Sequence, residues 1–597
     1  MSSTPSRMIV LACAAAFFCR ASAVLAQGSL TPPGAPAPTM KMLEQVEPRI
    51  PLDRAPVAIE RAGSYYLTDN LQGTVTVLAD NVSLDLMGFT ITSREGENAV
   101  VLDDVCKNFR IHNGVLSLLT QDGVGVAAAT GASVGLNGRI ESLRVSGGRY
   151  GISVGNGCTV RDCQVYGADT GIRVSGNSVV RDCRLEGNVT GLRVTGKGAF
   201  IADNIVRANT GNYDLVAGNQ LQLILSEVPV TLAWPCSAKL AGSLSSTTHG
   251  VTVSASGVTL DLMGFTLSGD LGSTDYGVYL AGTAAVPLNS VVVRNGGLRN
   301  FGMGVYAEQV VGNRFEGLNV SSNSNYGVYF YGQGGQCSGN VIADCSLVGN
   351  AFYGCYLYSS TGRCNGNTLD RCTICNNGNQ GLYLSGAYGQ CVGNAVTACS
   401  ISGNGSHGVY LSGYDGQCDG NTIARCRISG NAARGIYIYG YLGQCDGNVI
   451  SDCTLSGNSY GIYLYGTGGQ CDGNALSACT VDGNGSYGVY FNGSSGRCDG
   501  NSVVGCVIRQ HTASGIYVKE ARNNRIADNQ VSCYAGSAPY GILCESTSDN
   551  LILKNMCAGH TSNFSITTND TYGPVVSSGG SLATSGTSAH PWANFSR

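Results

Sequence analysis

The stretch "NTIARCRISGNAARGIYI" (residues 421–438) decides the fold, because near copies of it follow at regular intervals. The next two read "NVISDCTLSGNSYGIYL" (448–464) and "NALSACTVDGNGSYGVYF" (474–491), so the interval is first 27 and then 26 residues. Each copy holds short apolar pairs of strand size, separated by Gly and Asn residues that suit turns. No part of the repeat has the apolar spacing of an amphipathic helix.

Three short strands without a helix, in a unit of this length, are typical of one coil of a parallel β-helix. Each strand would pair in register with its counterpart one coil away, about 4.8 Å distant. Parallel crossover connections are right-handed, so an all-β, right-handed solenoid is predicted. The apolar columns, such as Ile423, Ile450 and Leu476, are expected inside it.

An internal duplication divides the repeats into two modules. The segments "ADNVSLDLMGFTIT" (79–92) and "ASGVTLDLMGFTLS" (255–268) place Asp85 and Asp261 at equivalent positions, and each opens a run of repeats. The first run is tighter, because "VRDC" recurs at 160 and 180. The predicted organisation is a signal peptide at 1–26, a Pro-rich leader and linker at 27–60, a first β-helix module at 61–222, a second module with Cys/Tyr-rich repeats at 223–575, and a Ser/Gly-rich tail at 576–597.

The repeat resembles a known family. Its pattern Asn-x-Ile-x-x-Asn/Cys-x-Ile…Gly-Ile-x-Leu is similar to the right-handed parallel β-helix repeat of the pectin-lyase-like superfamily, and within it to NosD-like and other uncharacterised exported bacterial proteins. The opening "VEPRIPLD" (46–53) and the closing "PWANFSR" (591–597) carry the same likeness. The resemblance implies the fold over nearly the whole mature chain. It does not imply one activity, because the superfamily includes lyases, hydrolases, epimerases and non-enzymes.

The N-terminus predicts export. Arg7 precedes an apolar run from Met8 to Phe18, and "ASAVLAQ" offers small residues for cleavage near Ala26. No later stretch approaches the roughly 20 apolar residues that span a bilayer. The net charge is −4 and no block of Lys or Arg stands out, which argues against a nucleic-acid partner. A secreted, periplasmic or cell-surface location is expected, in a compartment that permits disulfides.

Two columns of cysteines repeat with the coils of the second module. The second cysteine of each pair stands where related proteins stack Asn, at Cys345, Cys372, Cys399, Cys426, Cys453, Cys479 and Cys506. The first falls on a Gly-rich loop, at Cys337, Cys364, Cys391, Cys418, Cys445, Cys471 and Cys498. The second column is expected to be buried and to pack as small apolar residues. Because the two columns appear and disappear together, disulfides within the loop column or between the columns stay open as an alternative.

Neither a metal centre nor a catalytic set stands out. The Cys spacings do not match a zinc site, and the six His residues are scattered, so no cofactor is expected. Four loop carboxylates, Asp419, Asp446, Asp472 and Asp499, form one column that could hold calcium, although solvated loop residues are the simpler interpretation. No clustered carboxylates mark a lyase or hydrolase. The catalytic residues, if there are any, are unknown.

A row of tyrosines is the main functional signal. Alternation along the strand places these residues on the outside of successive coils, while their Ile, Val and Leu neighbours face the core. The row contains Tyr329, Tyr356, Tyr383, Tyr410, Tyr437, Tyr463 and Tyr490, and extends to Tyr279, Tyr306 and Tyr517. A partial second row holds Tyr331, Tyr358, Tyr439 and Tyr465. The equivalent first-module positions are Ser153, Arg173 and Arg193, so the fold itself does not demand tyrosine.

These observations favour an exported β-helix that binds polysaccharide or another surface polymer through an exposed tyrosine row, without catalysis. One alternative is a polysaccharide lyase or glycoside hydrolase whose acidic residues meet only in the fold. Another is a structural surface or matrix protein in which the tyrosines serve packing. The sequence does not define the oligomeric state.

Overall fold

The computed structural model describes residues 48–103, 106–128, 136–534, 536–577 and 590–597. Residues 51–597 are grouped in one compact unit, and the predicted signal peptide at 1–26 lies outside the described residues. Every regular element in the described part is a β-strand, so that part holds no helix suited to crossing a membrane.

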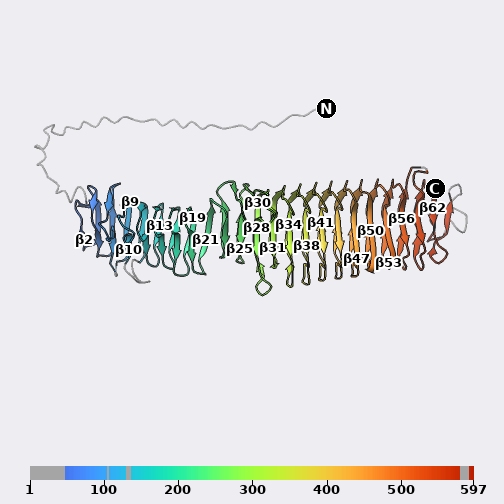
Figure 1. Cartoon of the computed structure of the whole chain (residues 1–597), viewed down its shortest axis with the longest axis horizontal. Coiled ribbons are helices and arrows are strands. Elements are labelled where there is room, and N and C mark those ends of the chain that lie inside the picture. Colours follow the sequence, from blue (N-terminus) through green and yellow to red (C-terminus); the bar gives the residue numbers. More distant parts are fainter. Residues whose placement is uncertain (1–47, 104–105, 129–135, 535, 578–589) are drawn as a thin grey trace, which may run out of the picture. The chain divides into compact units, whose positions relative to one another are not determined.

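One coil of the repeat consists of three strands. The coil that contains residues 421–438 is formed by β45 (Thr422–Ala424), β46 (Arg427–Ser429) and β47 (Arg434–Tyr441). The next is formed by β48 (Val449–Ser451), β49 (Thr454–Ser456) and β50 (Tyr460–Gln470). Successive coils pair in parallel and in register, so that each residue lies beside its repeat equivalent (Figure 1). The predicted parallel β-helix is confirmed.

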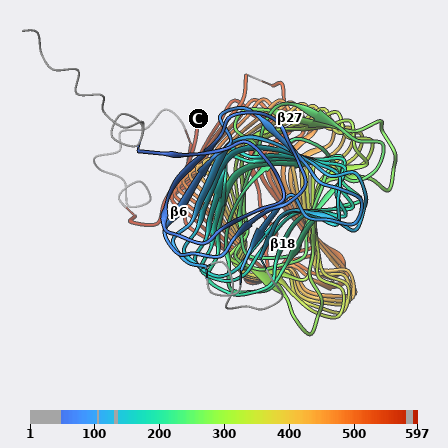
Figure 2. The same ribbon diagram turned by 90° about the vertical axis from the view of Figure 1, so that its left-hand side faces the viewer.

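Three long sheets run along the coils, which lie one behind another in Figure 2, and a fourth, short sheet joins β29 (Leu288–Asn289), β32 (Val310–Val311) and β35 (Cys337–Ser338). A 40-stranded sheet contains the first two strands of each coil. The third strands form an 8-stranded sheet of β2 (Val57–Ile59), β5 (Val75–Val77), β8 (Val100–Leu102), β10 (Val124–Ala128), β12 (Tyr150–Val154), β15 (Thr170–Val174), β18 (Thr190–Val194) and β20 (Gly211–Leu215).

The third strands of the later coils form a separate 14-stranded sheet, which is called the tyrosine sheet below. Its strands are β22 (Val230–Leu232), β25 (Val251–Val253), β28 (Tyr276–Ala281), β31 (Met303–Glu308), β34 (Val328–Tyr331), β38 (Cys355–Tyr358), β41 (Leu382–Ser385), β44 (Val409–Ser412), β47, β50, β53 (Val489–Arg497), β56 (Ser514–Lys519), β59 (Tyr540–Glu545) and β62 (Ser562–Ser565). The boundary between the two predicted modules at 222/223 stays a prediction.

The core is a set of stacked columns. Ile423, Ile450 and Leu476 are buried as predicted, each at most 1% exposed. Because the pairing is in register, each apolar side chain packs against a similar side chain one coil away, and this repetition forms one continuous core.

Two internal ladders of asparagine side chains tie the coils together. The Asn421 Oδ1 accepts hydrogen bonds from the backbone N and the Nδ2 of Asn394, at 2.8 and 3.0 Å, and the Asn421 Nδ2 donates to Asn448. The first ladder comprises Asn313, Asn340, Asn367, Asn394, Asn421, Asn448, Asn474, Asn501, Asn524 and Asn550. The second comprises Asn323, Asn350, Asn377, Asn404, Asn431, Asn458 and Asn484.

The folded region extends further at both ends than the sequence predicts. The strand β2 lies within the segment 27–60 that was expected to be a linker. At the other end, β65 (Asn594–Ser596) lies in the expected tail and pairs with β61 (Met556–Ala558). Asn594 is fully buried and accepts a hydrogen bond from Asn555, so this strand continues the internal bonding of the coils.

Candidate functional site

The predicted tyrosine row exists and is continuous. In-register pairing places Tyr383 beside Tyr410, and Tyr437 beside Tyr463, on neighbouring strands of the tyrosine sheet. The ring centroids are 4.7 Å apart in the first pair and 5.3 Å in the second, and the rings are nearly parallel. Identical aromatic residues at the coil spacing therefore stack face to face.

The prediction that this row is exposed is wrong. Tyr437, Tyr463 and Tyr517 are only 7–8% exposed, and Tyr383 and Tyr410 are half-buried. Both faces of each ring from Tyr306 to Tyr490 are covered by the rings of the neighbouring coils, as the stacking shows. Burial raises the pKa of Tyr463 to about 12. Only ring edges and hydroxyl groups are left to meet a ligand.

Two further rows flank the first one. Tyr331 stacks on Tyr358 and Tyr439 on Tyr465, which confirms the partial second row. A third row lies three residues before the first one along each strand, and sequence reasoning missed it although the spacing is constant. It includes Tyr276, Tyr326, Tyr353, Tyr460 and Tyr487, together with His407 and Arg434. The Arg434 guanidinium lies over the ring of Tyr437, 4.3 Å from its centroid.

Beside the tyrosine sheet lies a strip of loops, which is called the glycine–glutamine strip below and which sequence reasoning did not single out. Its lip row is Gly334, Thr361, Tyr388, Asp415, Leu442, Gly468 and Ser495. Its floor row is Gly335, Gly362, Gly389, Gly416, Gly443, Gly469 and Gly496. Its wall row is Gln336, Arg363, Gln390, Gln417, Gln444, Gln470 and Arg497, whose backbones pair from coil to coil.

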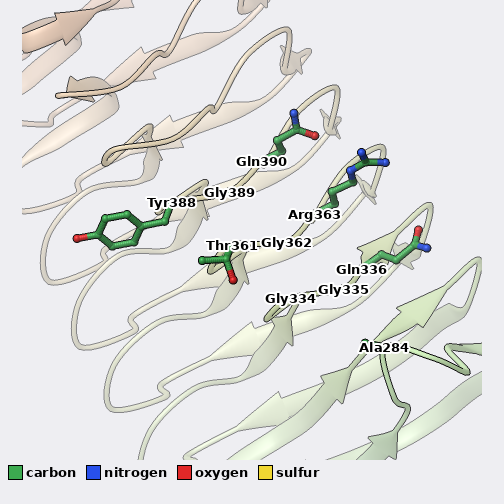
Figure 3. A pocket seen from close by; sticks show the side chains of 10 residues that line it. All are labelled: Ala284, Gly334, Gly335, Gln336, Thr361, Gly362, Arg363, Tyr388, Gly389 and Gln390. Carbon is green, nitrogen blue, oxygen red and sulfur yellow. The ribbon is translucent and has the colours of Figure 1, made fainter.

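The strip contains two hollows. The first has a volume of about 500 Å³ and is lined by three successive loops, from Gly334 to Gln390 (Figure 3). The second has about 320 Å³ and is lined by the loops from Leu442 to Arg497. Figure 3 shows the side chains of Gln336, Arg363 and Gln390 along one side of the first hollow, with Tyr388 and Thr361 on the other.

Close packing of the coils explains the glycine floor. A Cβ atom on Gly362 would lie 2.0 Å from the carbonyl oxygen of Gly332, and one on Gly416 would lie 1.9 Å from that of Gly386. No other residue fits these positions without moving a backbone. The floor consequently carries no side chains, and the hollows stay open between lip and wall.

Both cysteine columns are internal. The column from Cys345 to Cys506 is buried as predicted, with 1–3% of each residue exposed. The column from Cys337 to Cys498, which was placed on a loop, is fully buried as well, because these residues face the interior directly after the glycine–glutamine loops. All 24 described cysteines are free thiols in the structure.

The buried thiols should be unreactive in the folded protein, because a reagent cannot reach them. Burial raises the pKa of Cys418 and of Cys445 well above the usual value, which keeps them protonated at pH 8. We expect a thiol reagent to label only the partly exposed Cys375 and Cys533 in the native state. All 24 described thiols should be labelled after unfolding without reductant. A count near ten on the unfolded protein would instead show that the 14 column cysteines are joined by disulfides.

The candidate calcium column is part of the backbone hydrogen bonding between coils. The Asp419 Oδ1 accepts a hydrogen bond from the backbone N of Asp446 at 2.8 Å. In the next coil, the Asp446 Oδ1 accepts one from the backbone N of Asp472 at 2.7 Å. Asp472 also pairs with Arg497. These contacts give the carboxylates a structural role, in which each one caps the loop of the next coil. Calcium binding there stays a prediction.

Replacing Asp446 with Asn should stabilise the protein at pH 8 and have little effect at pH 4. Burial raises the pKa of Asp446 from 3.8 to about 6. The folded state thus prefers the protonated carboxyl group. Above pH 6 this group is ionised, and it then lowers the free energy of unfolding by its full amount, about 1 kcal/mol after allowance for the partial exposure of the side chain. This penalty vanishes as the pH falls below the unfolded pKa. Thermal midpoints across pH 4–8 check the effect, with the exposed Asp415→Asn as control.

A charged cluster lies on the 40-stranded sheet of the first module. The Glu141 carboxylate accepts hydrogen bonds from Arg110 and Arg161, at 2.9 Å each from Nη2 and Nε. Burial alone would raise the pKa of Glu141, but the two guanidinium groups outweigh it and lower the pKa. A carboxylate held ionised by two arginines is typical of an ion-pair network and unsuited to a general acid.

The comparisons with known proteins agree on the fold. A family model of the right-handed β-helix region matches residues 243–394 and 304–475, and a model of the periplasmic copper-binding protein NosD matches residues 439–574. No curated protein matches the chain in sequence.

Several solved structures are similar at low identity. A double mutant of the periplasmic alginate epimerase AlgG is 14% identical to this chain. The match covers 59% of this chain and 74% of the epimerase chain, with a TM-score of 0.32. A pectate lyase is 16% identical over 54% of this chain and 70% of its own, with a TM-score of 0.29. The A-module of a mannuronan C-5 epimerase from Azotobacter vinelandii is 13% identical over 85% of this chain and 89% of the A-module, with a TM-score of 0.21.

The residues of this chain do not fit a copper centre. Within the described residues, no group of three or more His, Cys, Asp or Glu side chains converges on one point. In the segment that matches the NosD model, eight of the nine cysteines are buried, and His511 is 3% exposed with its Nε2 against the carbonyl oxygen of Val481. No step of the proposals below involves copper.

Proposed function

We propose that this chain, a right-handed parallel β-helix protein, is exported and binds an extended polysaccharide without cleaving it. The observation that carries this proposal is the tyrosine sheet, on which three outward rows of mostly aromatic side chains repeat in register. A ligand that itself repeats can make the same contact on each coil. The first tyrosine row, from Tyr279 to Tyr517, would span on the order of 43 Å.

The comparison between the two β-helix modules supports a role beyond packing. In the 8-stranded sheet, Ser153, Arg173 and Arg193 pair with one another just as the tyrosines do in the other sheet. A stable stack of coils thus forms without an aromatic row. The tyrosines also stiffen the sheet, so the row supports binding by offering a flat, regular surface of ring edges and hydroxyl groups.

Export is proposed on separate grounds. The N-terminal segment has the pattern of a signal peptide, and the NosD model that matches residues 439–574 is that of a periplasmic protein. A polysaccharide of the cell surface or of the surroundings would be accessible to a protein in that location. The proposal includes no cofactor.

Affinity electrophoresis in gels that contain neutral, carboxylated or sulfated polysaccharides tests the function. At least one polysaccharide should retard the wild-type protein, and assays of the same mixtures, with and without calcium, should detect no new reducing ends or unsaturated products. Product release would establish the alternative of a lyase or hydrolase. Free migration in every gel would favour a structural matrix protein.

A further inference from the structure

We propose that the glycine–glutamine strip is the site that holds the polysaccharide, and that it takes a hydroxyl-rich chain carrying an acidic group, carboxylate or sulfate, opposite Arg363. This inference rests on the proposed function and assigns its contact line. The tyrosine sheet lies directly beside the strip, because seven of its strands, from β34 to β53, lead into or include a glycine–glutamine loop.

The lip row offers the free apolar surfaces that the tyrosine sheet lacks. Tyr388 and Leu442 are 57% and 55% exposed, at the edges of the first and second hollow. Both adopt positive φ angles, 55° and 53°, which bulky residues rarely do. The same row contains Gly334 and Gly468, which meet this backbone requirement without strain. Large exposed side chains at strained positions point to a selected contact with a ligand.

The tyrosine ring in the lip row is accessible in a way that the stacked rings are not. Tyr388 meets Tyr414 edge-on, with ring centroids 5.7 Å apart, and Tyr414 is itself 40% exposed. A T-shaped contact covers at most one face of Tyr388, whereas both faces of Tyr410 and Tyr437 are covered by their neighbours. Sugar rings pack on aromatic faces, so this geometry places the stacking contact at the lip, beside the ring edges of the tyrosine sheet.

The wall row supplies hydrogen-bonding groups at the coil spacing. The Gln390 Nε2 donates to the Oε1 of Gln417 at 2.9 Å, and the Gln417 Nε2 donates to that of Gln444 at 3.2 Å. Each amide has two N–H donors and two acceptor lone pairs, and the ladder uses one of each. The remaining donor and acceptor of Gln417 are available to sugar hydroxyl groups. The ladder also holds the amides in fixed orientations, which lowers the entropy lost on binding.

The charges that line the two hollows favour an acidic group on the ligand, and the exposed Asp415 of the lip row lies in the coil between them. None of the residues that line either hollow is an Asp or Glu, and each hollow is lined by one arginine. Arg497 is paired with Asp472, whereas Arg363 is exposed and, among the described residues, has no carboxylate within ion-pair distance. Five coils separate the two, about 24 Å. Arg363 is therefore the position at which a carboxylate or sulfate gains a charge-assisted hydrogen bond.

The neighbouring coils supply substitutions that suit the backbone. Tyr388→Thr copies Thr361, and Leu442→Asp copies Asp415, both of which have positive φ angles in the same row. Arg363→Gln copies Gln336 and Gln390 in the wall row. Tyr534→Thr removes a tyrosine that is 76% exposed and lies outside the strip, and serves as the matched control. Thermal midpoints near that of the wild type should verify that all variants fold.

The test is retention of these variants by neutral, carboxylated and sulfated forms of one polysaccharide backbone. The double variant Tyr388→Thr/Leu442→Asp should lose at least tenfold in affinity, and Tyr534→Thr should match the wild type. Arg363→Gln should abolish the preference for the acidic forms. The acidic form whose affinity falls most shows whether the group opposite Arg363 is a carboxylate or a sulfate. If the wild type is retained and the strip variants are retained equally well, the strip is not the binding site, although the proposed function stands. A wild type that no form retains would overturn both.

Discussion

Replacing Asn421 with Ala is expected to lower the free energy of unfolding by about 3–5 kcal/mol, because the ladder passes through this side chain. The substitution leaves the backbone N–H and the Nδ2 of Asn394 without their shared acceptor, and leaves the Oδ1 of Asn448 with only the backbone N–H of residue 421 as a donor. Asn421 is fully buried, so water cannot replace these bonds without rearrangement. Each buried group left unsatisfied destabilises by about 1–3 kcal/mol.

Denaturant unfolding, followed by circular dichroism, measures this effect. Asn325→Ala is the control, because Asn325 is only half-buried and its side chain makes a single long hydrogen bond, 3.4 Å to the carbonyl oxygen of Ser273. The control should stay within about 0.5 kcal/mol of the wild type. Equal effects at Asn421 and Asn325 would show that the ladder does not hold the coils together.

Replacing Tyr383, Tyr410, Tyr437 and Tyr463 with Ser should destabilise these coils by about 2–3 kcal/mol per position. The structure requires this large effect, since each ring is stacked on both faces and Tyr437 and Tyr463 are almost fully buried. An exposed row would have led us to expect only a modest fall in the thermal midpoint.

The matching Phe substitutions separate packing from binding. Phe keeps the ring stack and removes the hydroxyl group, so the thermal midpoint should fall far less than with Ser. At Tyr463 the Phe variant also loses a hydrogen bond, because the hydroxyl oxygen accepts one from Asn492. Glycan retention by the Phe variants, measured by affinity electrophoresis, then reports the contribution of the hydroxyl edges alone. Equal thermal midpoints for the Ser and Phe variants would contradict the stacking described above.

The period of the repeat was sufficient to predict the fold. Once residues 26 or 27 apart are placed side by side, the apolar columns of Ile423 and Ile450 must face inward and Tyr437 must lie beside Tyr463. The asparagine ladders could also have been found, since Asn421 recurs in every coil that carries the paired cysteines and Asn431 in all but the last of them, where His511 takes its place.

The exposure of the tyrosines could not be predicted in the same way. Alternation along a strand determines which face of the sheet a side chain occupies, but what covers that face depends on neighbouring rows. The burial of Tyr437 depends on its stacked neighbours and on Arg434, which lies three residues earlier. The hollows were equally inaccessible to sequence reasoning, because a glycine such as Gly416 indicates a turn and does not reveal the space that the turn leaves.

Calorimetric titration of the wild-type protein with oligosaccharides of increasing length, prepared from a polysaccharide that retains it, tests the central claim most directly. Binding along successive coils predicts that affinity rises with chain length over several sugar units, and that the ligand is recovered uncleaved. A disaccharide that binds as tightly as the polymer, or recovery of shortened products, would contradict a non-catalytic contact that extends along the coils.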